Sequence, residues 1–227
     1  GFRSSTDAVL LAAAVQAKSG DSVLELGCGA GVASLCLASR VPGLSLTGVE
    51  IQAQYAELAT RNAALNNTRI EVVNSCVTQL PQSVRDREFD HIMANPPFFD
   101  TNPLTLSPDR GRARARADNR ESLVQWLDVA QRRARQKGSV TIVMTAERLP
   151  EILASLTQKC GDIRIIPIAS RHGRAARRVI VSARKGGRGP LVLAAPIVMH
   201  DGEVHKADGD DFSPVAKDIL RNGEAIR

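Results

Sequence analysis

The sequence predicts an α/β fold, in which a doubly wound, mostly parallel seven-stranded sheet ends in an antiparallel hairpin. Short β-branched or leucine-rich runs alternate with longer helical stretches, a pattern typical of parallel sheets with helical crossovers. Hydrophobic residues make up 43% of the chain but aromatic residues only 3%, so Ala, Val, Leu and Ile must build the core. A length of 227 residues suits one domain with insertions, and we expect a single domain over 1–227.

The elements of this fold can be assigned in order along the chain. We expect the parallel strands at 22–26, 44–49, 70–73, 91–94 and 140–144. Between them lie predicted helices at 32–40, 52–66 and 121–136, followed by a helix at 148–159. The terminal hairpin is expected at 163–168 and 179–184, joined by a basic loop, and a further strand falls within 191–200 before a polar tail.

The net charge and the cysteines limit the kinds of binding partner that we expect. The net charge is +6 with a pI of about 9.5, which is compatible with a polyanionic partner. The four cysteines have no CxxC spacing and no clustered histidines, which argues against a metal site and a disulfide framework and indicates a reducing cytoplasm. No apolar run approaches the roughly 20 residues of a membrane-spanning helix, so we expect no membrane partner.

A glycine-rich turn follows the first predicted strand and opens a helix. Its glycines are Gly27, Gly29 and Gly31, which allow positive φ and close approach of a ligand, as at nucleotide sites. The dinucleotide pattern GxGxxG needs Gly or Ala at its sixth position, where Val32 or Ser34 stands. The Walker pattern needs Gly-Lys before Ser or Thr, which the chain lacks.

The remaining interpretation is an acid followed by GxGxG, which resembles the cofactor motif of methyltransferases. The resemblance implies S-adenosylmethionine as the cofactor, with Glu25 near its methionine part. Glu50, at the end of the second strand, is expected to accept both ribose hydroxyls. Related enzymes often carry an Asp for the adenine amino group after the third strand. Cys76 stands there in this chain, so we expect Ser75 and Cys76 to line that part of the pocket.

A tetrapeptide, Asn95-Pro96-Pro97-Phe98, ends the fourth strand. Prolines lack the backbone donor of a central strand, so the chain must leave the sheet at its carboxyl edge, where ligands bind in open α/β folds. An exocyclic amine on an aromatic base is a poor nucleophile, and two acceptors holding its hydrogens would aim its lone pair. The Asn95 side-chain oxygen and the Pro96 carbonyl are candidates for these acceptors, and Phe98 offers a stacking face.

The tetrapeptide resembles that of the NPP(Y/F) methyltransferases, which modify N6 of adenine, N2 of guanine or the glutamine side-chain amide. The segment 1–20, with Thr6-Asp7 ahead of Leu10-Leu11, is similar to the entry segment of the bacterial tRNA1(Val) adenine-N6 methyltransferase group. There it helps to close the cofactor pocket, and 177–181 is similar to that group's terminal hairpin. The resemblance implies methylation of adenine N6 in tRNA.

Two basic loops are candidates for binding RNA phosphates, or else are ordinary solvated loops. Their arginines, in 100–120 and 170–178, include Arg110, Arg112, Arg114, Arg116, Arg174 and Arg177. The first loop departs from the resembled group in length and composition. Because the glycine-rich turn does not identify the methyl acceptor, an O-methyltransferase or a protein glutamine-amide methyltransferase remains an alternative. A module that binds cofactor or RNA without catalysis is another, suggested by Cys76 in place of the expected Asp.

Overall fold

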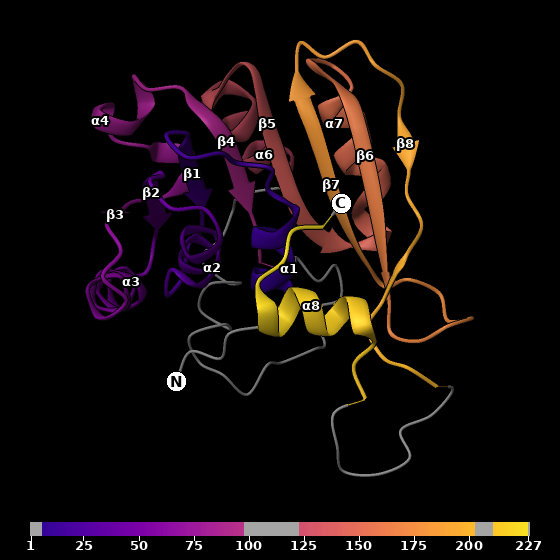
Figure 1. Ribbon diagram of the computed structural model, residues 1–227. Coiled ribbons are helices and arrows are strands. Elements are labelled where there is room, and N and C mark those ends of the chain that lie inside the picture. The colour runs from indigo at the N-terminus through magenta and orange to yellow at the C-terminus, as the bar shows by residue number, and fades with distance from the viewer. Residues whose placement is uncertain (1–5, 98–122, 203–210, 227) are drawn as a thin grey trace, which may run out of the picture.

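The computed structural model describes residues 6–97, 123–202 and 211–226, and its strands form one mixed sheet (Figure 1). Strands β1 to β5 are mutually parallel, and β7 runs antiparallel to both β5 and β6. This confirms the α/β fold, its parallel part and its antiparallel hairpin. In spatial order the strands are β3 (Ile70–Asn74), β2 (Ser45–Glu50), β1 (Ser22–Leu26), β4 (Phe89–Ala94), β5 (Ala134–Thr145), β7 (Arg178–Lys185) and β6 (Cys160–Ala169).

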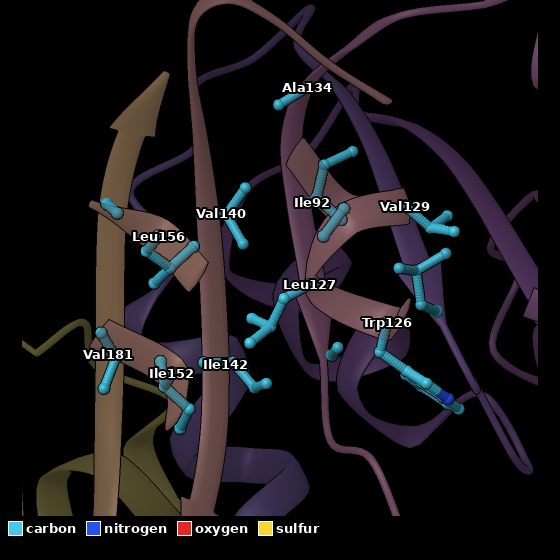
Figure 2. Close-up of a cluster of buried hydrophobic side chains, with 14 of the residues drawn as sticks. Ile92, Trp126, Leu127, Val129, Ala134, Val140, Ile142, Ile152, Leu156 and Val181 are labelled. Atoms are coloured by element: carbon cyan, nitrogen blue, oxygen red, sulfur yellow. The ribbon is translucent and has the colours of Figure 1, made fainter. Parts of the chain in front are cut away.

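Helices cover both faces of the sheet. One apolar layer packs under the first set, α1 (Thr6–Ala14), α2 (Val32–Arg40), α3 (Ala53–Leu65) and α8 (Pro214–Asn222). The other layer lies under α6 (Leu123–Arg133), α7 (Leu149–Leu156), η1 (Val77–Gln79) and α4 (Gln82–Arg85), while η2 (Ala146–Arg148) leads into α7. Figure 2 shows Leu127 of α6 and Leu156 of α7 packed on the sheet, whose strands contribute Ile92, Val140 and Val181 to the same cluster.

The sheet is larger than the predicted seven strands. The region 191–200 forms two strands of two residues each, β8 (Val192–Leu193) and β9 (Ile197–Val198), and both pair with β6. Pro196 separates them, because proline has no N–H to continue the ladder. Strand β5 begins at Ala134, so the predicted helix 121–136 ends three residues early, at Arg133.

The tail that the sequence analysis left without structure contains helix α8. Ser213 caps its N-terminus by accepting a hydrogen bond from the Ala216 amide at 3.1 Å, and Pro214 occupies the first turn. Gly223 ends the helix at φ +70°. Buried Ala216 and Ile219 then pack α8 onto the layer around α1.

Candidate active site

The glycine turn between β1 and α2 has the backbone that its sequence predicts. Gly27, Gly29 and Gly31 have φ values of +68°, +53° and +80°, a region that L-residues with a Cβ rarely enter. A Cβ on Gly27 would also stand 2.6 Å from Cη2 of Trp126, and one on Gly31 would stand 3.4 Å from the Ala59 Cβ. At Gly27, a side chain is therefore excluded both by the backbone conformation and by the lack of space.

Glu50 fastens this turn to the end of β2. Its Oε2 accepts a hydrogen bond from the Gly29 amide at 2.9 Å, and its Oε1 accepts one from the Gln52 amide at 2.9 Å. Burial raises the pKa of Glu50 above its usual value, although the hydrogen bonds from these backbone amides oppose the shift. Because each carboxylate oxygen can accept a second hydrogen bond, the group keeps capacity for two ligand hydroxyls.

Glu25 is directed at α2. Its Oε2 accepts hydrogen bonds from the Ser34 hydroxyl at 2.5 Å and the Ser34 amide at 3.1 Å. Gly31, the N-cap residue, has no side chain, so Glu25 satisfies one of the free amides in the first turn of the helix. Burial raises the pKa of Glu25 to about 7, although the Ser34 hydrogen bonds oppose the shift. Sequence analysis missed Ser34 because it lies nine residues beyond Glu25.

The residues after β3 are held beside Glu50 by their own hydrogen bonds. The side-chain amide of Asn74 donates to the backbone carbonyls of Glu50 and Ile51 at 2.8 and 3.0 Å. The Ser75 amide donates to the Glu50 carbonyl at 3.0 Å, and the Cys76 thiol lies 3.1 Å from the Thr78 hydroxyl. The structure thus places Ser75 and Cys76 at the same edge of the sheet as the glycine turn.

The start of the tetrapeptide lies beside that turn. Leu26 pairs with Ala94 in the ladder, so Gly27 and Asn95 leave neighbouring parallel strands at the same level. Asn95 is half-buried and Pro96 is buried. Within the described part of the chain, no hydrogen bond of the Asn95 side chain is found. Pro97 follows, and Phe98 lies outside the described residues.

Asp7 of the entry segment contacts the terminal hairpin. It is 8% exposed, and its Oδ2 lies 3.5 Å from Nε of Arg178, at the start of β7, while its neighbour Thr6 is exposed. The guanidinium of Arg40 donates to the carbonyls of Ala12 and Val15 at 2.8 and 2.6 Å, which ties the end of α1 to α2. The two segments that carried the family resemblance therefore meet in space.

Of the two basic loops, the one between β6 and β7 lies within the described residues. Arg174 and Arg177 are exposed in the turn between β6 and β7. Since β6 runs parallel to β5, this turn lies at the carboxyl edge, as Asn95 does. Their neighbour Arg171 instead pairs with Asp211 at 2.5 Å. Residues Arg110, Arg112, Arg114 and Arg116 lie outside the described ranges.

Trp126 is the residue at this edge that sequence analysis missed. It stands in the second turn of α6, is 5% exposed, and places its ring against Gly27. Its indole Nε1–H has no hydrogen-bond partner in the part of the chain that the structure describes. As the only tryptophan, three positions after Leu123 on an apolar helix face, it offered a signal for burial but none for its contact.

Metal-ligating clusters and membrane-spanning helices are both lacking from the described ranges. Over 6–97, 123–202 and 211–226, no group of three or more His, Cys, Asp or Glu residues could hold a metal ion. Over the same ranges, no helix is long and apolar enough to cross a membrane. None of the four cysteines, Cys28, Cys36, Cys76 and Cys160, forms a disulfide.

Comparisons with known proteins agree with this geometry. Residues 5–108 match the model of the methyltransferase small domain. The chain is 31% identical over 188 residues to a tRNA1(Val) (adenine(37)-N6)-methyltransferase of Shewanella baltica, covering 79% of this chain and 76% of that one. The crystal structure of a predicted O-methyltransferase from Agrobacterium tumefaciens is 27% identical, with a TM-score of 0.75 over 97% of this chain and 98% of that one.

A third similarity concerns the fold alone. A T. thermophilus 16S rRNA N2 methyltransferase, solved with S-adenosylmethionine and guanosine, superposes with a TM-score of 0.52 at 22% identity. The match covers 74% of this chain and 38% of that one. The sheet and its helices thus have the arrangement of class I methyltransferases.

Proposed function

The chain belongs to the class I methyltransferase family that includes the tRNA1(Val) adenine-N6 enzymes, and from that premise we propose that it methylates N6 of an adenine in tRNA. S-adenosylmethionine is the methyl donor that this family uses. The observation that carries the proposal is the adjacency of Gly27 and Asn95 at the ends of β1 and β4. A donor bound over the glycine turn and a base bound at the tetrapeptide would then be neighbours.

The glycine turn fits S-adenosylmethionine. Its three glycines adopt the left-handed backbone that turns the chain from β1 into α2, and Glu50 is fixed by two backbone amides with acceptor capacity left for the ribose hydroxyls. Buried Glu25 places a carboxyl group under the same turn, where the methionine part of the cofactor would lie. The cofactor supplies an electrophilic methyl group on its sulfonium.

The chain's own groups would position and polarise the accepting nitrogen. The Asn95 oxygen and the Pro96 carbonyl would accept its two hydrogens, which directs the lone pair along the line of methyl transfer. Phe98 would stack on the base. The proton is lost from a nitrogen that has become cationic, so no strong general base is needed. Thr6, Asp7, Ser75 and Cys76 would line the cofactor pocket around this centre.

RNA is the proposed substrate for two reasons. The curated relatives carry tRNA in their names, at 29–31% identity over about four fifths of this chain. Arg174 and Arg177 are exposed at the same edge as Asn95, where they could bind phosphates, and the arginines of 100–120 would add to them. The proposed site of action is the cytoplasm, consistent with four cysteines that form no disulfide.

Transfer of labelled methyl from S-adenosylmethionine to RNA from cells that lack this protein tests the proposal. Nucleoside analysis should show N6-methyladenosine. Asn95→Ala should lower turnover by at least about a hundredfold, with cofactor affinity by calorimetry nearly unchanged. Asn222→Ala, an exposed asparagine at the end of α8, is the matched control and should behave as wild type. Loss of cofactor binding in Asn95→Ala would contradict its assigned role.

One finding favours a second candidate, an O-methyltransferase. The Agrobacterium tumefaciens structure, which covers nearly the whole chain, is described as a predicted O-methyltransferase. If cofactor binds but no RNA is labelled, the adenine-N6 proposal fails and small hydroxylated acceptors become the substrates to assay.

A further inference from the structure

A second concentration of positive charge lies at the opposite, amino edge of the sheet. There the end of α6, the starts of β5 and β6, and the end of β7 come together (Figure 1). We call this region the basic corner and define it by its six exposed basic residues, Arg132, Arg135, Lys137, Lys159, Arg184 and Arg188. Three carboxylates, Asp90, Asp128 and Asp162, contact these side chains, so cations are in twofold excess.

A bulge at the start of β5 presents part of this charge. Phe89 pairs with Ala134 and His91 pairs with Ser139, so two steps along β4 correspond to five along β5. The extra residues, 135–137, leave the ladder, and Lys137 adopts φ +66°. That conformation is costly for a residue with a Cβ, and such strain persists where the surrounding structure enforces it, often at functional sites.

A glycine-rich turn after β7 forms the other half of the corner. Asp162, itself at φ +49°, accepts a hydrogen bond from the Gly189 amide at 2.6 Å. The Gly186 amide donates to the Lys159 carbonyl at 2.9 Å. The Gln136 side-chain amide fills the space where a Cβ of Gly186 would stand, so the bulge and the turn are in contact. These contacts fix the two segments side by side, and the segments carry Lys137 and Arg188.

From this geometry we propose that the basic corner binds backbone phosphates of the RNA substrate, remote from the base that reacts. The inference rests on the proposed function, because it takes RNA as the substrate. Exposed ion pairs contribute little to stability, so phosphates can replace the carboxylates at small cost. Strand β5 has 12 residues, of which three form the bulge, so its remaining eight ladder steps of about 3.3 Å separate the two edges by roughly 26 Å. An RNA that reaches both must extend well beyond its target base.

The test removes two charges without disturbing the catalytic edge. In Lys137→Gly with Arg188→Ala, glycine accepts the left-handed backbone, so the fold is retained. Arg61→Ala with Arg69→Ala is the control, since both residues are exposed and lie by α3 and β3, across the sheet. Binding of fluorescein-labelled, unfractionated tRNA is measured by anisotropy between about 50 and 200 mM salt. The corner variant should bind about three- to tenfold more weakly, with a salt slope reduced by about one to two.

A methylation assay separates this inference from the function on which it rests. The tRNA that accepts label from wild type is compared with an excised stem-loop that carries the same target base. The corner variant should raise KM for the full-length tRNA only, with kcat and the stem-loop reaction unchanged. Equal losses of tRNA affinity in the two double variants would overturn the corner's role. So would a corner variant that binds tRNA as wild type does while wild type captures an acidic protein through the corner. Absence of label with wild type would instead refute the proposed function.

Discussion

The two edges of the sheet use the same backbone conformation for opposite purposes. At the carboxyl edge, left-handed φ values belong to Gly27, Gly29 and Gly31, and the Trp126 ring packs where a Cβ of Gly27 would stand. At the amino edge, Lys137 and Asp162 adopt left-handed φ and keep their side chains. Both edges carry exposed cations, Arg174 and Arg177 at the first and the basic corner at the second, but buried carboxylates lie only under the first of these two sites. Under the proposed function, the carboxyl edge would hold the cofactor and the target base, and the amino edge would contact the RNA backbone.

The largest expected effect tests the need for glycine at the carboxyl edge. Gly27→Ala combines a disfavoured φ with a Cβ placed 2.6 Å from Trp126, at a cost of about 4 kcal/mol to the native turn. Calorimetry should detect no S-adenosylmethionine binding, and chemical unfolding should show lowered stability. Gly31→Ala, whose Cβ meets Ala59 at 3.4 Å, is the milder comparison. Equal effects of the two variants would show that φ alone matters and that the Trp126 contact does not.

An intermediate effect tests the buried carboxyl group under the same edge. Burial raises the pKa of Glu25 from its usual 4.5 to about 7, so the folded state retains this proton between pH 4.5 and 7 while the unfolded chain loses it. The stability that the neutral form provides is present below pH 4.5 and is lost as pH rises through 7, by about 3 kcal/mol. Glu25→Gln should remove this decline in urea unfolding measured at pH 5 and pH 8.

A matched variant isolates that titration. Glu57→Gln changes the same chemical group at an exposed position on α3 and should leave the wild-type pH dependence intact. If Glu25→Gln declines with pH as steeply as wild type, Glu25 is ionised throughout this range and burial does not control its protonation.

The smallest effect tests strain at the amino edge. Lys137→Gly relieves the left-handed φ and should raise stability by about 1 kcal/mol or less, which is measured by urea unfolding. Lys137→Ala removes the same charge but keeps a Cβ, so it should give no such gain. An equal gain from both variants would assign the effect to lost charge repulsion, and the contrast between the edges would then rest on charge alone.

What the sequence predicts well in this chain is local. The strand runs of the parallel sheet, the glycine turn and the exit of the chain at Asn95 follow from periodicity and from the backbone limits of glycine and proline. The predicted start of β5 was wrong. The first residues of this strand belong to a bulge, whose Arg-Gln-Lys sequence continues a helical pattern. Helix α8 was not predicted, although Ser213-Pro214 is a typical start of a helix, because the surrounding segment is polar.

Contacts between distant segments were not predictable in this way. Asp7 meets Arg178 across 171 positions, and no local pattern links the two. Trp126 reaches Gly27 only because α6 packs on the sheet face beneath the turn. Such pairs depend on the assembled fold, whereas the motifs depend on a few consecutive residues.

The position of Trp126 also gives the protein an optical signal of its own. It is the only indole in the chain, it is almost fully shielded from solvent, and its ring touches the first glycine of the turn. Emission from a buried indole responds to small changes in its surroundings, so rearrangement of the turn when a ligand binds should change the fluorescence of the unlabelled protein. A simple titration would then follow events at the carboxyl edge while a labelled RNA reports on the amino edge.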